Sequence, residues 1–180
     1  MSLKLAVFDL DGTLFSTKDV NYRAYKEALG ELPLDYDFYC KACNGQNYRQ
    51  FLPKIVPGIT EDEMQRIHEA KKRAYPKYLK YAELNEELLK NFLEINALVT
   101  TASRRNAEDI LSEFGLKDSF DFVITQEDVE NTKPDPECFL LALSRAGVKK
   151  EETIVYEDSE PGFKAAEAAG LKYVKVEGFN

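Results

Sequence analysis

The sequence has few cysteines and no long apolar run, which excludes several protein classes. Three cysteines in 180 residues form no disulfide framework, which favours a reducing compartment. No apolar run approaches the roughly 18 residues of a transmembrane helix, and the first run is too short for a signal peptide. We therefore expect a cytoplasmic protein with no membrane partner.

Positive charge is also scarce. The 24 lysines and arginines are outnumbered by 32 aspartates and glutamates, so the formal net charge is −8. This balance argues against a nucleic-acid backbone or an anionic membrane surface as the main partner. We expect a monomer or weak dimer, and an acidic protein can still bind a small phosphorylated molecule if it supplies cations locally.

Histidine occurs only once, as His68. Cys40 and Cys43 form a C-x-x-C pair, but no second pair or nearby histidine completes a zinc site, and we expect both to be structural. His68 and residues 71–73 lie in a polar helical stretch. We expect both on a solvated helix face.

Short apolar runs alternate with helical stretches over much of the chain. The predicted strands are residues 5–8, 97–101, 122–125, 153–156 and 173–176, and the predicted helices between them are 106–114, 136–146 and 162–169. Strands that alternate with helices imply a parallel sheet. The sequence therefore predicts an α/β core formed by residues 1–15 and 85–180, in which 85–96 is a further helix.

Residues 16–84 have a different pattern, with no convincing strand. Helical spacing covers 18–29, 36–43, 47–56 and 60–81. Thr60 and Glu63 match a capping box, and Pro76 should end or kink the last helix near Tyr75. We predict a small all-helical cap domain inserted on a βα loop, where ligands of such folds bind.

Two carboxylates follow the first predicted strand. Asp9 comes directly after the apolar run 5–8, and Asp11 lies two residues later, before Gly12 and Thr13. Buried strands do not normally end in paired acids for packing reasons. Two carboxylates at this place can share a divalent cation, or divide nucleophilic and acid–base roles between them.

The other predicted strands are followed by polar residues as well. The second strand ends in Thr100 and Thr101, with Ser103 two residues beyond. Lys133 lies on the loop after the third strand, and Glu157 and Asp158 follow the fourth. Each of these residues, taken alone, also has an ordinary structural explanation. Asp158 or Ser159, for example, could cap the next helix. Because the carboxyl ends of parallel strands share one edge of a sheet, the whole set predicts a phosphate-handling site.

These segments resemble the motifs of the haloacid dehalogenase superfamily, in the capped subfamily similar to β-phosphoglucomutase and phosphoglycolate phosphatase. Residues 8–15, FDLDGTLF, are similar to the first motif, Thr101 to the second, Lys133 with Pro134 to the third, and residues 157–162, EDSEPG, to the fourth. The resemblance covers essentially the whole chain. It implies a Rossmann-like core, dependence on Mg²⁺ and a covalent aspartyl-phosphate intermediate.

The resemblance also implies roles for the acidic residues. Asp9 is expected to attack phosphorus as the nucleophile, and Asp11 to protonate the leaving oxygen and then deprotonate water. The expected Mg²⁺ ligands are Asp9, Asp158 and the main-chain carbonyl of Asp11. Glu157 is expected to bind the ion directly or through water.

Two further residues are expected to handle the phosphoryl group. Lys133 should offset charge on Asp9 and on the phosphoryl oxygens. Thr101 should hydrogen-bond a phosphoryl oxygen, with Thr100 as the alternative. Substrate contacts are expected from the cap loop 44–49, through Gln46, Tyr48 and Arg49, and from Ser103.

The main hypothesis is an Mg²⁺-dependent phosphatase for a small phosphorylated metabolite. A phosphosugar mutase of the β-phosphoglucomutase type is one alternative, but such enzymes carry a cap histidine where this chain has Asn21. A 2-haloacid dehalogenase is another, but it needs neither Asp11 nor the metal site with Asp158. A catalytically silent metabolite-binding protein is a third, although no catalytic residue is missing.

Overall fold

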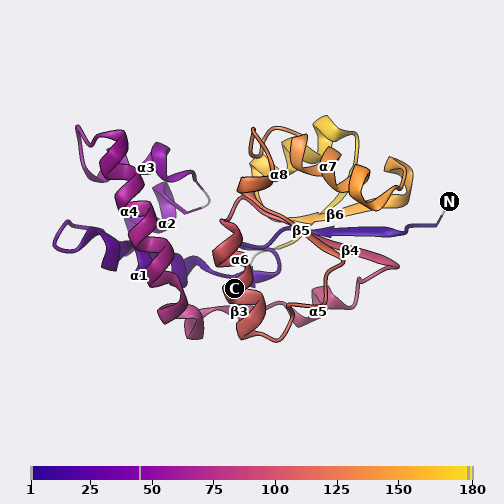
Figure 1. The fold of residues 1–180 in the computed structure, drawn as a ribbon, viewed down its shortest axis with the longest axis horizontal. Helices are drawn as coiled ribbons and strands as arrows, with labels where there is room; N and C mark the ends of the chain where they lie inside the picture. Colours follow the sequence, from indigo (N-terminus) through magenta and orange to yellow (C-terminus); the bar gives the residue numbers. More distant parts are fainter. Residues whose placement is uncertain (1, 45, 178, 180) are drawn as a thin grey trace. The chain divides into compact units, whose positions relative to one another are not determined.

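The computed structural model describes residues 2–44, 46–177 and 179 of the chain (Figure 1). It has two compact units: Met1–Ser16 with Glu83–Asn180, here called the core unit, and Thr17–Ala82, here called the helical unit. Gly45, in the predicted substrate loop, lies outside the described residues.

The core unit contains a five-stranded parallel sheet, which confirms the predicted fold class. The strand order is β5-β4-β1-β6-β7. The strands are β1 (Leu5–Phe8), β4 (Ile95–Val99), β5 (Phe122–Ile124), β6 (Thr153–Glu157) and β7 (Lys172–Lys175). β4 ends two residues before its predicted end, so Thr100 and Thr101 lie on the loop at the sheet edge.

Helices cover both faces of this sheet. They are α5 (Glu86–Leu89), α6 (Arg104–Glu113), α7 (Glu137–Ala146) and α8 (Glu160–Ala169), with short 3₁₀ helices η2 (Gln126–Asp128) and η3 (Lys150–Glu152). Figure 1 shows α7 and α8 above the sheet and α5 and α6 below it.

The central strand β1 is buried along its whole length. Leu5 and Val7 belong to the apolar cluster formed with α7 and α8. Phe8 stacks on Tyr156, with ring centroids 4.9 Å apart, and its ring also lies 5.3 Å from that of Phe92. Alternate residues of a strand point to opposite faces, so a strand covered on both faces reads as a continuous apolar run.

Two predictions for the segment that returns to the sheet are wrong. The strand β3 (Glu83–Leu84) pairs antiparallel with β2 (Phe15–Ser16), although we expected no strand there. Two residues are too few for a recognisable alternation. The helix expected over 85–96 is only the short α5, because the Asn96 side chain bonds both the N–H and the C=O of Leu93 and closes a turn instead.

The helical unit contains α1 (Lys18–Leu29), α2 (Tyr36–Ala42), α3 (Tyr48–Ile55), α4 (Glu61–Ala74) and the 3₁₀ helix η1 (Tyr75–Tyr81). The capping box predicted for Thr60 and Glu63 is present at the start of α4. α4 ends just before Pro76, as predicted, and the chain continues as a tighter helix.

Two residues of α4 expected on a solvated face pack within the helical unit instead, His68 partly buried and Lys71 buried. The His68 ring stacks on Tyr48, with centroids 4.1 Å apart, and its Nδ1 lies 3.2 Å from the Tyr25 hydroxyl. Lys71 is only 6% exposed, and its Nζ lies 4.6 Å from the Tyr75 ring centroid. α4 packs against α1, and long side chains can bury their apolar parts in such a contact.

Cys40, Cys43 and Cys138 are all free thiols. Burial raises the pKa of the Cys138 thiol to about 11, which disfavours the reactive thiolate. Within the described ranges, no helix is long and apolar enough to cross a membrane.

Candidate active site

The core unit brings together four of the predicted site residues at one edge of its sheet. Asp9 follows β1, Lys133 lies on the segment after η2, Glu157 ends β6 and Asp158 follows it. These four residues come from distant parts of the sequence. They meet because the strands are parallel and their carboxyl ends share an edge.

Lys133 is the centre of this group. Its Nζ donates to Asp9 Oδ1 at 2.7 Å, to Glu157 Oε2 at 2.7 Å and to the carbonyl oxygen of Val99 at 3.0 Å. An ammonium group has three N–H donors, so all three are used. Its side chain is 3% exposed, and Lys133 therefore fixes Asp9 to Glu157 away from water.

Glu157 is fully buried, and both of its carboxylate oxygens accept hydrogen bonds. Besides the bond from Lys133 to Oε2, Oε1 accepts from the Ser159 hydroxyl at 2.8 Å and from the N–H groups of Asp158 and Ser159, both at 3.2 Å. A Cβ at Gly162 would lie 2.0 Å from Glu157 Cδ. The first turn of α8 therefore requires glycine at this position.

Asp158 lies against the two residues that follow the paired aspartates, Gly12 and Thr13. Thr13 Oγ1 donates to Asp158 Oδ1 at 2.8 Å. Gly12 has a φ of +90°, and a Cβ there would lie 2.1 Å from Asp158 Oδ2. Glycine tolerates both the left-handed backbone and this close approach. Gly12 and Thr13 thus bring the loop after β1 into contact with Asp158, which follows β6.

The buried acids outnumber the buried cation. Asp9, Glu157 and Asp158 each offer a carboxylate oxygen, and these oxygens lie within 4.8 Å of one another. When the three acids and Lys133 are all ionised, the group carries two excess negative charges. Carboxylate oxygens are ligands that Mg²⁺ prefers, and a divalent ion would balance this excess, so the residues fit a bound Mg²⁺.

The pKa directions show the same excess of negative charge. Burial, followed by repulsion from Glu157, raises the pKa of Asp9 well above its usual range, against the attraction of Lys133. Burial raises the pKa of Asp158 to about 6. For Lys133, burial lowers the pKa, but the charges of Asp9 and Glu157 outweigh it and the net pKa is raised. Lys133 therefore stays cationic, and its single positive charge does not balance the negative charges of the acids.

The threonines after β4 differ in exposure. Thr100 is buried, and its Oγ1 accepts from the Ala102 N–H at 3.0 Å. Thr101 is exposed. Ser103 is buried and caps α6 by accepting from the Asn106 N–H at 3.3 Å. This arrangement favours Thr101 over Thr100 for contact with a ligand and gives Ser103 a structural use.

The predicted cap residues are each engaged within the helical unit. Gln46 is exposed and accepts from Lys54 Nζ at 3.2 Å. Tyr48 is 8% exposed and stacks on His68. The Arg49 guanidinium lies 4.6 Å from the Tyr48 ring centroid and pairs with Glu61 at 2.5 Å. Among the three, Gln46 and Arg49 are the exposed side chains.

Asp11 has a backbone position set by the turn after β1. It forms a bridge with Phe15, next to the 2.7 Å bond from the Gly12 N–H to the Phe15 carbonyl. Its side chain is partly exposed. The turn therefore presents Asp11 two residues beyond Asp9, on the same loop.

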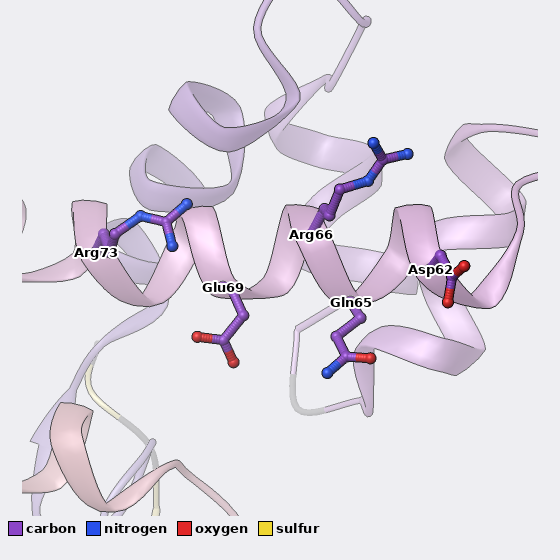
Figure 2. Close-up of a pocket in the computed structure, with 5 residues that line it drawn as sticks. All are labelled: Asp62, Gln65, Arg66, Glu69 and Arg73. Atoms are coloured by element: carbon purple, nitrogen blue, oxygen red, sulfur yellow. The ribbon is translucent and has the colours of Figure 1, made fainter.

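One surface hollow, of about 690 Å³, lies elsewhere (Figure 2). Figure 2 shows that its lining side chains all come from α4 and that Arg66 points away from Gln65 and Glu69. The lining residues are Asp62, Gln65, Arg66, Glu69 and Arg73. They include none of the predicted catalytic residues and do not converge on one point, so we assign the chemistry to the sheet edge.

Three residues that support the acidic group were not among the predicted site residues: Thr13, Ser159 and Gly162. The sequence offered only a weak signal for them, since each lies within a few residues of a predicted acid. Thr13 reaches an acid 145 positions away. Such a contact depends on the folded sheet and has no local pattern.

Comparisons with known proteins agree with the geometry. The family model described as haloacid dehalogenase-like hydrolase matches residues 6–176. A phosphorylated carbohydrates phosphatase of Thermotoga maritima is 32% identical over 96% of this chain and 84% of its own. Fructose-1-phosphate phosphatase YqaB of Escherichia coli is 28% identical over 94% of both chains. CbbY of Rhodobacter sphaeroides, solved in complex with phosphate, has a TM-score of 0.85 at 25% identity and covers 98% of this chain and 87% of its own.

Proposed function

The chain is a phosphoric monoester hydrolase of the haloacid dehalogenase-like family, and we propose that it hydrolyses a small phosphorylated metabolite through an aspartyl-phosphate intermediate, with Mg²⁺. The observation that carries this proposal is the buried contact of Lys133 with Asp9 and Glu157, next to Asp158. A nucleophilic carboxylate, a fixed cation and a further acid are the groups that phosphoryl transfer to a carboxylate needs.

In the first step, a carboxylate oxygen of Asp9 forms a bond to phosphorus, and the bond from phosphorus to the leaving oxygen breaks. Asp11 gives its proton to that oxygen. In the second step, Asp11 takes a proton from water, whose oxygen forms a bond to phosphorus while the bond from phosphorus to the Asp9 oxygen breaks, and inorganic phosphate leaves. The Asp9 carboxylate is then restored, so protons and charges balance over the cycle.

Asp9, Asp158 and the main-chain carbonyl of Asp11 would hold the metal ion. Mg²⁺ supplies the positive charge that lets a carboxylate approach a phosphate. Glu157 already accepts hydrogen bonds at both oxygens, so we assign it a contact through water and a structural hold on Lys133. Thr101 is proposed to donate to a phosphoryl oxygen, because its side chain is the exposed one of the threonine pair.

The proposed substrate class is a sugar phosphate or a similarly small phosphorylated acid. Two relatives are named for phosphorylated carbohydrates and for fructose 1-phosphate. The exposed cap residues Gln46 and Arg49 are proposed to contact the leaving group. Water is proposed as the acceptor, because Asn21 cannot act as the base that a mutase would use to activate a sugar hydroxyl. A cytoplasmic location and a monomer or weak dimer stay predictions.

Phosphate release from a generic aryl phosphate tests the reaction. We expect release with Mg²⁺ and none in excess chelator, with recovery when Mg²⁺ is restored. Undiminished activity in chelator would contradict the metal assignment. A panel of sugar phosphates and phospho-acids then identifies the substrate class.

Asp9→Asn tests the nucleophile. This variant keeps the shape of the side chain but lacks the nucleophilic carboxylate, so turnover should be abolished while the far-UV circular dichroism spectrum stays unchanged. Thr60→Ala, at the start of α4, is a matched control that should retain turnover. Retained turnover in Asp9→Asn would remove Asp9 from the nucleophile role.

A further inference from the structure

We propose that Ser159 is a positioning residue, which orients Glu157 so that Glu157 holds Lys133 against the nucleophile Asp9. The proposal rests on the proposed function, because it explains how the catalytic lysine and nucleophile are held. It adds a role for a residue whose local sequence context suggests only a helix cap.

The Ser159 hydroxyl makes two hydrogen bonds at once. It accepts from the Gly162 N–H at 3.2 Å, which caps α8, and it donates to Glu157 Oε1 at 2.8 Å. A hydroxyl has one donor and two acceptor sites, so the two bonds do not compete. Capping requires only the acceptor. The donor is therefore available to hold the carboxylate.

The hold on Glu157 extends to the nucleophile through three charge-assisted contacts. Ser159 binds Oε1, Lys133 binds Oε2 at 2.7 Å, and Lys133 also binds Asp9 Oδ1 at 2.7 Å. Hydrogen bonds to charged groups are short and stronger than neutral ones. Of the three donors to Oε1, the Ser159 hydroxyl is the closest, since both main-chain N–H groups lie at 3.2 Å.

The Glu157 carboxylate packs closely against Gly162, in the first turn of α8. The carboxylate occupies the volume that a Cβ at Gly162 would fill, 2.0 Å from Glu157 Cδ. Glu157 has no exposed surface, so water cannot readily replace a hydrogen-bond donor that its carboxylate loses. Without the hydroxyl, Oε1 keeps only the two longer bonds, and Glu157 and Lys133 gain freedom to move.

The test compares the wild-type enzyme with three variants on an aryl phosphate at saturating Mg²⁺. Ser159→Ala removes both bonds of the hydroxyl, Ser159→Thr keeps both, and Thr60→Ala removes a cap of the same kind at α4. We expect Ser159→Ala to lower kcat by about tenfold at unchanged KM, since one charge-assisted bond is lost. Ser159→Thr should restore kcat, and Thr60→Ala should lower thermal stability without lowering kcat.

A second readout needs neither metal nor substrate. A lysine ammonium locked between buried carboxylates exchanges slowly with water, so its ¹⁵N-coupled protons should be visible by NMR. The Lys133 signal, identified by its loss in Lys133→Met, should be present in the wild type and in Ser159→Thr and absent or broadened in Ser159→Ala.

The inference is overturned if Ser159→Ala keeps wild-type kcat, if Thr60→Ala lowers kcat equally, or if the Lys133 signal is unchanged in Ser159→Ala. Failure of the proposed function gives a different result. In that case the wild type itself releases no phosphate, while the Lys133 signal still reports whether Ser159 holds Glu157.

Discussion

Acidification from pH 7 to pH 5 tests how His68 is held in the helical unit. Burial, with smaller effects from the charges of Lys71 and Lys72, lowers the pKa of His68 from 6.5 to about 4. Arg49 acts in the same direction, and Glu69 opposes it. The imidazole is therefore neutral in the folded protein at pH 7, stacked on Tyr48 and bonded to the Tyr25 hydroxyl.

The sign and size of the effect follow from proton linkage. Between pH 6.5 and pH 4, the unfolded chain binds a proton at His68 that the folded chain does not, so the free energy of unfolding falls as the pH falls. The difference between 6.5 and about 4 corresponds to about 3 kcal/mol when complete. At pH 5 about 2 kcal/mol of this is already lost.

Urea unfolding of the wild type and of His68→Phe at pH 7, 6 and 5 measures the contribution of His68 to the free energy of unfolding. Phenylalanine keeps an aromatic ring against Tyr48 but does not titrate. The chain has no tryptophan, so far-UV circular dichroism is the suitable signal. The wild type should lose about 2 kcal/mol relative to His68→Phe between pH 7 and pH 5.

The comparison removes the contribution of other acids. Buried carboxylates such as Asp9 and Asp158 titrate in both proteins, so they cancel in the difference. The lost bond to the Tyr25 hydroxyl costs the variant a constant amount, because burial raises the pKa of Tyr25 above its usual value. A difference between the two proteins that does not change with pH would refute the reasoning.

Two further substitutions test the site and the cap. Gly12→Ala places a Cβ 2.1 Å from Asp158 Oδ2 at a φ of +90°, so the Mg²⁺ concentration for half-maximal activity should rise by about tenfold or more; an unchanged Mg²⁺ titration would contradict the hold on Asp158. Arg49→Ala should change KM or kcat on the best sugar phosphate more than on an aryl phosphate, and an equal effect on both would count against a specificity role.

The core unit could be predicted from sequence because its signals are local and repeated. The buried run of β1 and the helices between the strands recur at regular spacing, and the strand ends carry the acids, the threonines and Lys133. The end of β4 was misplaced for a local reason. Threonine favours strands, but the Thr100 hydroxyl bonds the Ala102 N–H and turns the chain.

Burial in the helical unit was harder to predict because it depends on which helices face each other. His68 and Lys71 lie in a polar stretch, yet they follow the buried Met64 at helical spacing and precede the buried Tyr75. These four positions form one face of the helix, and that face can be recognised in the sequence once α1 is known to pack against it. Polarity alone predicts that His68 and Lys71 face solvent, since neither residue is apolar.

The contacts of Lys133 give a physical reason to expect that the reaction requires a divalent cation. Its three donors are used by Asp9, Glu157 and the Val99 carbonyl, so a phosphoryl oxygen gains a bond from Lys133 only if one of these is released. The ionised group already carries two excess negative charges, and a phosphate dianion would add two more. Repulsion in a buried site is strong, because water screens it poorly. We therefore expect activity without a divalent ion to be lost rather than reduced, even at high concentrations of a monovalent salt.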